Sequence, residues 1–331
     1  MVKKILVTLS VILIGISMAI YFGLKGTIKS PFVKTDSDVV VIDANGDTFY
    51  SVLYENEDKF KNKIYFKIYN KIKDMSISVV KGEYEFPSNI TLVELLDALE
   101  HGTYNKSIKR VTIPEGYTIE QIGKVLEKNN IITAKEFLKA CDEYELPEYI
   151  EFNPKVFYDL EGYLFPDTYF IKEGTSGKSI INMMLKRFEN VISEIEEENN
   201  ITIDKKDLSD IVIKASMIEK EVRVDKEKPI VASVINNRLE KGMPLQLDAT
   251  VLYALREHKT SVTIADTKVK SLYNTYYVTG LPCGAIGSPG KNSIVAAVLP
   301  DKTDYLYYMT KDGLNHKFFK DYSSFLEYKN S

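Results

Sequence analysis

The stretch from Leu208 to Val222 reads Leu-Ser-Asp-Ile-Val-Ile-Lys-Ala-Ser-Met-Ile-Glu-Lys-Glu-Val. At about 100° per residue, most of its apolar side chains fall on a single arc of roughly 120°. An arc of this width predicts a helix that packs one face against a hydrophobic core. The residues on the arc are Leu208, Ile211, Val212, Ala215, Ile218 and Val222.

Glu219 falls on the same arc, about 80° from Ile211, whereas Lys220 and Glu221 fall outside it. An ionised carboxylate on a buried face costs free energy unless it is paired. Burial raises the pKa of an unpaired glutamate and favours the protonated form, which is ready to act as a general acid. The alternative is a salt bridge from Glu219 to Arg238 or to a lysine. The helix pattern leaves both interpretations open.

Composition limits the class of protein. The chain has 331 residues, of which 44% are hydrophobic and 27% charged, as is typical of globular chains with about two domains. The net charge of -4, without a long basic run, predicts no nucleic-acid partner. Cys141 and Cys283 lie far apart, and His101, His258 and His316 stand singly. We therefore expect no disulfide framework and no metal site built from these residues.

The segment Ile5–Leu24 is uncharged and long enough to cross a bilayer as a helix. A cleaved signal peptide is the alternative, with Ser17-Met18-Ala19 as a weak cleavage site. We expect a retained single-pass anchor in the cell membrane, with a short cytoplasmic tail and the bulk of the chain outside the cytoplasm. The basic residues on the two sides are nearly balanced, so this orientation rests on convention more than on charge.

The pattern beyond the anchor predicts an α+β fold with a small α/β unit followed by a larger mixed domain. In the small unit, Val39–Ile42 and Ser76–Val80 read as strands, and Phe60–Ile72 has a helical repeat. A further helix begins after Thr91, with Glu94 in the capping-box position, and ends at Gly102. The expected division is 1–25 tail and transmembrane helix, 26–38 linker, 39–105 small unit and 106–331 larger domain.

The larger domain begins with a strand and turn at Val111–Tyr117. Gln246-Leu247-Asp248 reads as an extended piece with Gln246 and Asp248 on one face. The Gly- and Pro-rich segment Gly280–Gly290 predicts a shaped loop that lines a site. Further expected elements are capping boxes at Thr118/Gln121 and Thr133/Glu136, helices at Ser176–Asn199, Pro229–Lys241 and Asn292–Val298, and strands at Tyr305–Met309 and Phe318–Phe319.

Several motifs together, in this order and spacing, resemble the YceG-like family, the endolytic murein transglycosylases called MltG. The likeness covers nearly the whole chain. One departure is Leu281-Pro282-Cys283-Gly284-Ala285-Ile286, where family members commonly carry Leu-Pro-Pro-Gly-Pro-Ile. It leaves the details of saccharide contact open, but not the chemistry at Glu219. The matching motifs are Glu161–Tyr169, Ala215–Glu221, Asn237–Leu239, Gln246–Thr250, Tyr273–Tyr276 and Gly280–Pro282.

The resemblance implies a membrane-anchored enzyme that cuts peptidoglycan glycan strands internally, between N-acetylmuramic acid and N-acetylglucosamine, and leaves 1,6-anhydro-muramic ends. Such an enzyme would trim or terminate nascent strands beside glycan-polymerising synthases, without a metal or organic cofactor. The family's catalytic glutamate falls on Glu219, and the small unit corresponds to a LysM-like subdomain. Residues expected to bind substrate or support Glu219 are Glu161, Tyr163, Asp167, Ser216, Glu221, Asn237, Arg238, Gln246, Asp248, Thr250, Tyr273, Asn274, Tyr276, Gly280 and Pro282.

Three hypotheses remain. In the first, protonated Glu219 donates to the glycosidic oxygen, the 2-acetamido group assists, and the substrate's own 6-hydroxyl attacks. In the second, the chain is a water-using muramidase with Asp248 or Glu161 as the second carboxylate, since ordinary glycosidases use two. In the third, it is a non-catalytic membrane-anchored scaffold that binds glycan or synthases. The identity of the reaction product separates the first two hypotheses.

Overall fold

The computed structural model describes residues 31–33, 39–46, 48–61, 78–104, 108–256, 259 and 261–331. The predicted membrane segment Ile5–Leu24 lies outside these residues, as does most of the predicted helix Phe60–Ile72. Within the part of the chain that is described, no helix is both long and apolar enough to cross a bilayer.

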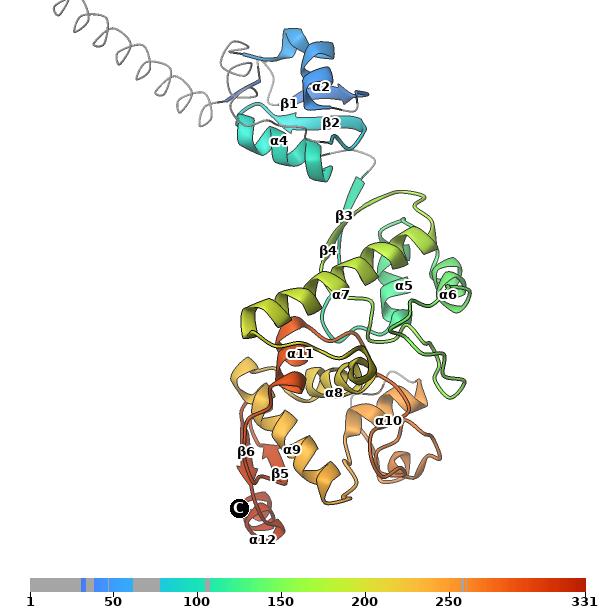
Figure 1. Cartoon of the computed structure of the whole chain (residues 1–331), viewed down its shortest axis with the longest axis vertical. Coiled ribbons are helices and arrows are strands. Elements are labelled where there is room, and N and C mark those ends of the chain that lie inside the picture. The colour runs from blue at the N-terminus through green and yellow to red at the C-terminus, as the bar shows by residue number, and fades with distance from the viewer. Residues whose placement is uncertain are drawn as a thin grey trace, which may run out of the picture. The chain divides into compact units, whose positions relative to one another are not determined.

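The chain divides into two compact units (Figure 1). The first comprises Met1–Arg110 with Phe170–Glu173, and the second comprises Val111–Tyr169 with Gly174–Ser331. Both combine helices with small two-stranded sheets, and helix predominates, so the predicted α+β class is confirmed.

In the first unit, strand β1 (Val39–Ala44) pairs antiparallel with β2 (Gly82–Pro87). Alternate side chains of β1 and β2 are buried, as expected for a sheet with one face on a core. Helix α4 (Leu92–His101) buries its apolar face in the same cluster. Its capping box and its left-handed cap at Gly102 confirm the predicted helix. The unit also contains α2 (Phe49–Glu55) and the short 3-10 helix η1 (Glu57–Lys59).

The predicted strand Ser76–Val80 is not formed in its described residues. There, Ser78 makes only an isolated bridge to Thr48. The β-branched residues of this stretch indicated a strand, but a strand also needs a partner along its length, which one sequence does not reveal.

Eight helices are described in the second unit: α5 (Ile119–Lys128), α6 (Ala134–Asp142), α7 (Gly177–Asn199), α8 (Leu208–Glu221), α9 (Lys228–Glu240), α10 (Asp248–Leu255), α11 (Lys291–Val298) and α12 (Tyr322–Asn330). The short 3-10 helices are η2 (Lys205–Asp207), η3 (Asp225–Glu227) and η4 (Asp266–Lys268). Strand β3 (Ile108–Thr112) pairs with β4 (Thr168–Lys172), and β5 (Tyr307–Thr310) pairs with β6 (His316–Phe319).

These elements follow the sequence pattern closely. The capping boxes at the starts of α5 and α6 are present as predicted, with Thr118 and Thr133 accepting from backbone N–H groups three residues on. Helix α7 begins after Ser176, whose hydroxyl accepts from the N–H of Ser179.

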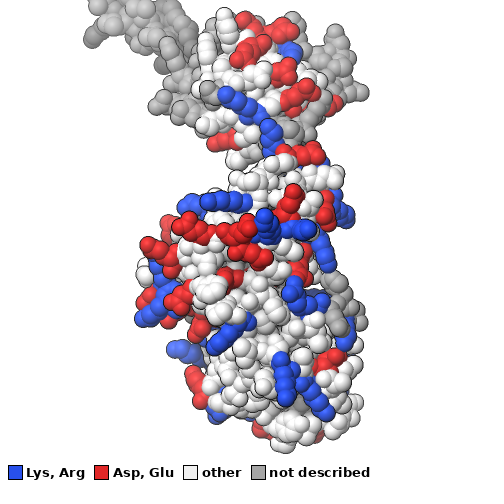
Figure 2. Space-filling view, turned by 90° about the vertical axis from the view of Figure 1, so that its right-hand side faces the viewer, with Lys and Arg blue, Asp and Glu red and all other residues white. Residues whose placement is uncertain are grey.

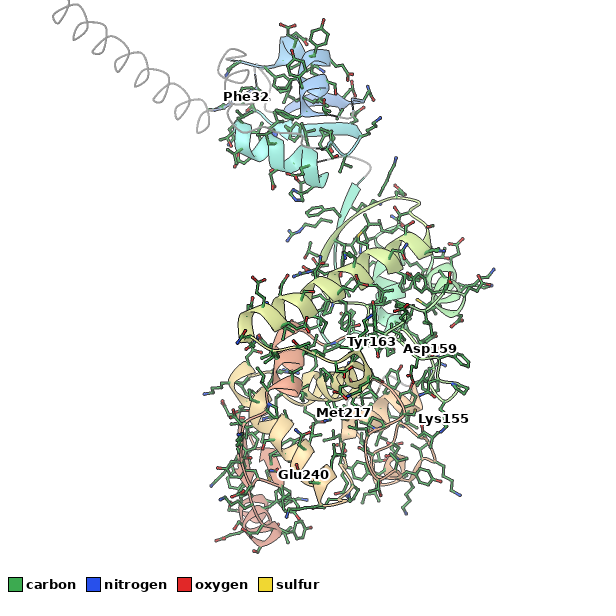
Figure 3. All side chains as sticks on the ribbon, viewed as in Figure 1. Phe32, Lys155, Asp159, Tyr163, Met217 and Glu240 are labelled. Atoms are coloured by element: carbon green, nitrogen blue, oxygen red, sulfur yellow. The ribbon has the colours of Figure 1, made fainter. Side chains whose placement is uncertain are left out.

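Helix α8 is the centre of the second unit. It packs against α9, α10 and α11, and most of its predicted apolar face is buried. Its side chains are also buried outside the predicted arc, as at Met217, which lies in the middle of the unit in Figure 3. The surrounding helices explain this burial. Each fully buried Ile or Met side chain contributes about 1.5–3 kcal/mol, so α8 anchors the unit.

Gly162 sits where the chain passes close to α8. Its φ is +89°, a conformation that favours glycine. A Cβ atom at this position would lie 2.5 Å from Cγ1 of Val212 and 2.7 Å from Cβ of Ala285. The glycine therefore allows the loop before β4 to contact both α8 and the 280–290 loop.

We expect Gly162→Ala to destabilise the second unit by about 3 kcal/mol, through backbone strain and overpacking together. Gly174→Ala is the matched control, because Gly174 also has positive φ (+76°) but has no atom within 4 Å of the place where the added methyl carbon would lie. The control should lose only about 1 kcal/mol. Differential scanning calorimetry of the full-length chain measures both changes, and equal losses would contradict the packing argument.

Candidate active site

Glu219 lies in the last turn of α8, and its side chain is 10% exposed. Three groups converge on its Oε2 atom. The Ser293 hydroxyl donates at 2.6 Å, the Gly290 N–H donates at 3.0 Å, and Nζ of Lys228 forms an ion pair at 3.5 Å. Of the two interpretations of the helix pattern, the structure has the salt bridge, and its partner is Lys228 and not Arg238.

Lys228 is the first residue of α9, and its side chain is 4% exposed. Its ammonium group also forms an ion pair with Asp225 at 3.0 Å. Burial alone would lower the pKa of Lys228, but its contacts with Asp225 and Glu219 outweigh that effect and raise the pKa. The site therefore has a permanent cation beside Glu219.

Glu115 is a second carboxylate at this site. A Cβ atom on Gly290 would overlap both carboxylate oxygens of Glu115, so the Glu115 side chain lies against the same residue whose N–H binds Glu219. Partial burial of the carboxylate raises the pKa of Glu115, and the nearby charge of Glu219 raises it further. Glu115 was not predicted from the sequence, because an exposed acid in a turn has no periodic signal. The one signal in the sequence was the glycine that follows it, Gly116, which the structure places in the left-handed region with a φ of +74°.

The predicted glycine loop lies against this site. The N–H of Gly116 donates to the carbonyl of Ser288 at 2.7 Å, and the N–H of Ser288 donates to the carbonyl of Tyr117 at 2.8 Å. A Cβ atom on Gly287 would lie 2.6 Å from the carbonyl oxygen of Gly116. Only a glycine allows the two backbone segments to come this close.

The hydroxyl of Ser288 is, among the described residues, the one buried side-chain polar atom without a hydrogen-bond partner. Such an unmade bond costs about 1–3 kcal/mol. Ser216 helps to hold the loop in place, since its hydroxyl accepts the N–H of Ile286 at 3.1 Å. Ser216 is thus a supporting residue of the loop.

The departures from the family's loop pattern lie away from the Glu219 contacts. The Cys283 thiol contacts the carbonyl of Lys155 at 3.4 Å, and its own carbonyl accepts from the side chain of Asn153 at 2.9 Å. Ala285 is buried, as is Pro282 three residues before it. Gly280 has a φ of +100°, which explains the glycine there.

Glu221, two residues after Glu219, belongs to a different cluster. The Tyr308 hydroxyl donates to it at 3.0 Å, and burial raises the pKa of Glu221 to about 6. Asp248 and Arg238 are among its charged neighbours. The Tyr276 hydroxyl donates to Asp248 at 2.7 Å. The structure therefore brings four predicted site residues together, but around Glu221 and not around Glu219.

Asn237 and Arg238 bind the backbone instead of Glu219. The Asn237 amide donates to the carbonyls of Thr303 and Tyr305 at 2.8 and 2.9 Å. The Arg238 guanidinium donates to the carbonyls of Leu306 and Leu245 at 2.6 and 2.7 Å. Both side chains satisfy backbone carbonyls, which is a structural role.

The predicted extended piece Gln246–Asp248 is wrong. Gln246 is exposed and has a φ of +53°, while Asp248 is the first residue of α10. The left-handed turn at Gln246 separates the two side chains. The hydroxyls of Thr250 and Thr275 lie 2.9 Å apart and are buried, so Thr250 fixes this turn instead of facing a substrate.

Tyr273 and Asn274 hold the loop before residue 280. The Tyr273 hydroxyl accepts the N–H of Phe157 at 3.1 Å. The Asn274 amide donates to the carbonyls of Thr267 and Val269 at 3.0 and 2.8 Å, and the side chain is fully buried. Both residues therefore shape the loop and lie apart from the groups that bind Glu219.

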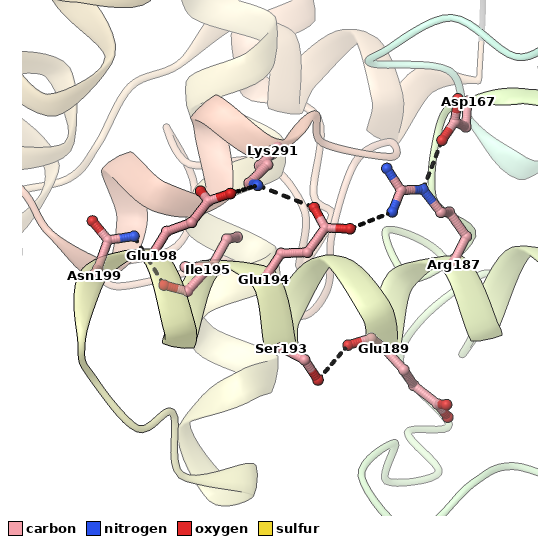
Figure 4. A network of polar contacts seen from close by, with 9 residues as sticks. All are labelled: Asp167, Arg187, Glu189, Ser193, Glu194, Ile195, Glu198, Asn199 and Lys291. Atoms are coloured by element: carbon pink, nitrogen blue, oxygen red, sulfur yellow. Dashed lines mark hydrogen bonds and ion pairs between the residues drawn. The ribbon is translucent and has the colours of Figure 1, made fainter. Parts of the chain in front are cut away.

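Asp167 belongs to an ion-pair network that joins α7 to α11 (Figure 4). Arg187 pairs with Asp167 and with Glu194, each at 2.7 Å. Lys291 pairs with Glu194 at 3.0 Å and with Glu198 at 2.8 Å. Because Lys291 follows Gly290, this network holds the start of α11. The Gly290 N–H and the Ser293 hydroxyl, which both donate to Glu219, lie in this part of the chain.

Acidic and basic side chains are intermixed over the face of the molecule in Figure 2. Many ion pairs of the second unit are exposed, such as Lys139 with Glu143, and exposed pairs contribute little to stability. The buried pair of Glu219 and Lys228 is different, because removing one partner leaves an uncompensated buried charge.

Glu161 is 3% exposed and caps the start of α5. It accepts the N–H of Ile119 at 3.1 Å and the hydroxyl of Tyr253 at 2.8 Å. It also lines a cavity of about 230 Å³ together with Lys220 and Arg256. Burial raises the pKa of Glu161 to about 7.

Tyr163 has a packing role. Its ring makes an edge contact with Phe188 at 5.5 Å between centroids, and a tilted contact with Tyr149 at 6.3 Å. Burial raises the pKa of Tyr163 to about 12. The side chain is part of the core beneath α7, in the middle of the unit in Figure 3.

Glu161 should make stability depend on pH. Because its folded pKa of about 7 exceeds the ordinary value of 4.5, its stabilisation is complete below pH 4.5 and is lost as pH rises through 7. Between pH 5 and 8 the free energy of unfolding of the wild-type chain should fall by on the order of 2–3 kcal/mol relative to that of Glu161→Gln, whose side chain stays neutral. Thermal unfolding of both proteins across this range tests it. Parallel pH curves would contradict the assignment.

Comparison with known proteins supports the resemblance seen in the sequence. Residues 41–331 match the YceG-like family. The chain is 34% identical over 276 residues to the endolytic murein transglycosylase of Bacillus subtilis (strain 168), covering 79% of this chain and 74% of that protein. It is 29% identical over 350 residues to the protein of the same name from Streptococcus pneumoniae serotype 2, covering 93% of this chain and 61% of that protein.

A solved structure gives the same result. The crystal structure of a putative yceG-like protein from Listeria monocytogenes has a TM-score of 0.57 and 30% sequence identity, and the match covers 88% of this chain and 100% of that one. The chain spans about three fifths of the length of its pneumococcal relative. With a family match over most of its length and a relative more than 30% identical, this chain belongs to the YceG-like family.

Proposed function

We propose that this chain is a lytic transglycosylase that cleaves peptidoglycan glycan strands internally, between N-acetylmuramic acid and N-acetylglucosamine, and leaves 1,6-anhydro-muramic ends. The observation that carries the proposal is the setting of Glu219. Its carboxylate is fixed by Lys228, Ser293 and Gly290 but keeps a 10% exposed side chain. The names of the Bacillus and Streptococcus relatives support the same activity.

All three contacts to Glu219 end on Oε2, which leaves Oε1 to carry the transferred proton. Protonated Glu219 donates to the glycosidic oxygen as the bond from C1 breaks, and the 2-acetamido group of the substrate assists. The 6-hydroxyl then attacks C1 and loses its proton to a carboxylate of the site. The attacking group belongs to the substrate, so the reaction has the advantage of proximity.

The water-using muramidase remains the second candidate, with Asp248 or Glu161 as the second carboxylate. Two observations count against it. Glu161 is enclosed by the start of α5 and Tyr253, and Asp248 bonds Tyr276 beside the Glu221 cluster. Both carboxylates therefore have partners other than the groups that bind Glu219. A non-catalytic scaffold would not need a carboxylate held as Glu219 is.

The setting in the cell is part of the proposal. The uncharged segment Ile5–Leu24 would anchor the chain in the cell membrane as a single span, with the catalytic domain outside the cytoplasm. There it would reach newly made strands and the synthases that polymerise them. The small unit at 39–105 would act as a LysM-like module. Protease accessibility of the second unit in intact cells tests this orientation.

We expect Glu219→Gln to lower the cleavage rate by about 10²–10⁴-fold, because an amide is too weak an acid to protonate the leaving oxygen. Full-length wild type, Glu219→Gln and the control Glu240→Gln are purified in detergent and given uncrosslinked glycan strands. Glu240 is exposed at the end of α9, so its variant should behave as wild type. Products are analysed by mass spectrometry.

Anhydro-ended fragments from wild type and Glu240→Gln alone are the expected result. Reducing ends would select the muramidase. Turnover by Glu219→Gln equal to that of wild type would contradict the proposed role of Glu219. Strand binding without cleavage by every protein would favour the scaffold.

A further inference from the structure

Glu115 and Glu219 contact the same backbone residue. Glu219 accepts the N–H of Gly290 at 3.0 Å, and the two carboxylate oxygens of Glu115 fill the space that a Cβ atom on Gly290 would occupy. Gly290 precedes α11, and the close approach of Glu115 requires a residue without a side chain there. The two carboxylates are therefore held together by the fold.

The two carboxylates differ in their surroundings. Glu219 is largely buried and bound by three groups, whereas Glu115 is an exposed residue. The charged groups that act on Glu115 are Glu219 of α8, Lys228 of α9 and Asp225 of η3. Lys291 of α11 pairs elsewhere, with Glu194 and Glu198 of α7.

Three carboxylates therefore share one ammonium group. Lys228 is committed to Asp225 and Glu219, at 3.0 and 3.5 Å. Like charges around a common site favour proton uptake by one of the carboxylates. Partial burial raises the pKa of Glu115 first, and the charge of Glu219 raises it further. The two carboxylates therefore hold one proton between them, and the reacting state is the one with that proton on Glu219 and with Glu115 ionised.

The proposed reaction needs two proton transfers on one face of the sugar ring. The leaving oxygen of the β-glycosidic bond takes up a proton, and the attacking 6-hydroxyl gives one up. The 1,6-anhydro bridge forms on the face that the leaving oxygen vacates. A donor and an acceptor that sit side by side, as Glu219 and Glu115 do at Gly290, match this geometry.

We propose that Glu115 is a second catalytic carboxylate, which accepts the 6-hydroxyl proton while Glu219 donates to the leaving oxygen. In this step the proton of Glu219 moves to the glycosidic oxygen and the C1–oxygen bond breaks. The O6–C1 bond forms, and the proton of O6 moves to Glu115. Transfer of that proton back to Glu219, directly or through water, restores the starting state. This inference rests on the proposed lytic function.

The test is the pH dependence of kcat and KM for full-length wild type, Glu115→Gln and Glu115→Asp on uncrosslinked strands. Wild type should lose activity in acid, where Glu115 is protonated, and the raised pKa of this carboxyl places that acid limb above the range of an ordinary glutamate. Glu115→Gln should lose at least about 10-fold in kcat, lack the acid limb and keep its KM. Glu115→Asp should restore the acid limb in part.

Glu197→Gln is the matched control, since Glu197 is an exposed glutamate on α7. It should keep the wild-type profile. If Glu115→Gln keeps the wild-type kcat and acid limb, or only lowers the melting temperature, Glu115 is no more than a structural contact of α11 and its proposed role is overturned. Reducing ends from wild type would overturn the lytic function and this role together, whereas anhydro ends with an unchanged Glu115→Gln profile overturn Glu115 alone.

Discussion

The buried ion pair between Glu219 and Lys228 is the interaction on which the site depends. Glu219 lies in the last turn of α8, Lys228 begins α9, and their side chains are 10% and 4% exposed. A buried pair stabilises a fold only weakly, but the loss of one partner is costly. The arrangement therefore fixes how α8 and α9 meet. Gly290 and Ser293 bring α11 to the same oxygen, so three helices meet at one carboxylate.

The rest of the second unit supports this junction. Ser216 holds the 280–290 loop through Ile286, and Gly162 allows the loop before β4 to reach α8. The network from Asp167 to Lys291 ties α11 to α7. Several residues expected at a substrate surface therefore act on the backbone that carries Glu219. These supporting residues leave 10% of the Glu219 side chain exposed, and a ligand can reach the carboxylate only there.

Local patterns in the sequence predicted most of the helices correctly. The capping boxes before α4, α5 and α6 and the apolar arc of α8 depend on residues three or four apart, and all were confirmed. The helical periodicity also placed Glu219 on the buried face. Contacts between distant segments were not predicted from the sequence. Arg238 was assigned to the site because of its charge, but it donates hydrogen bonds to the backbone carbonyls of Leu306 and Leu245.

The remaining differences have the same cause. The left-handed turn at Gln246 depends on a hydrogen bond to the backbone of Thr275, which leaves no signal in the local pattern. Glu115 and Lys228 are separated from Glu219 by 104 and 9 residues, and only folding makes them neighbours. One sequence reveals which residues a helix presents to the core, but not which residues of other segments meet them there.

The central claim is that the carboxylate at the end of α8 directs attack by the substrate's own hydroxyl instead of by water. Cleavage of glycan strands in water enriched in ¹⁸O tests this claim most directly. Internal attack predicts that the new muramic end contains no heavy oxygen. One ¹⁸O atom at that end, from the earliest products onward, would contradict the account and identify water as the nucleophile.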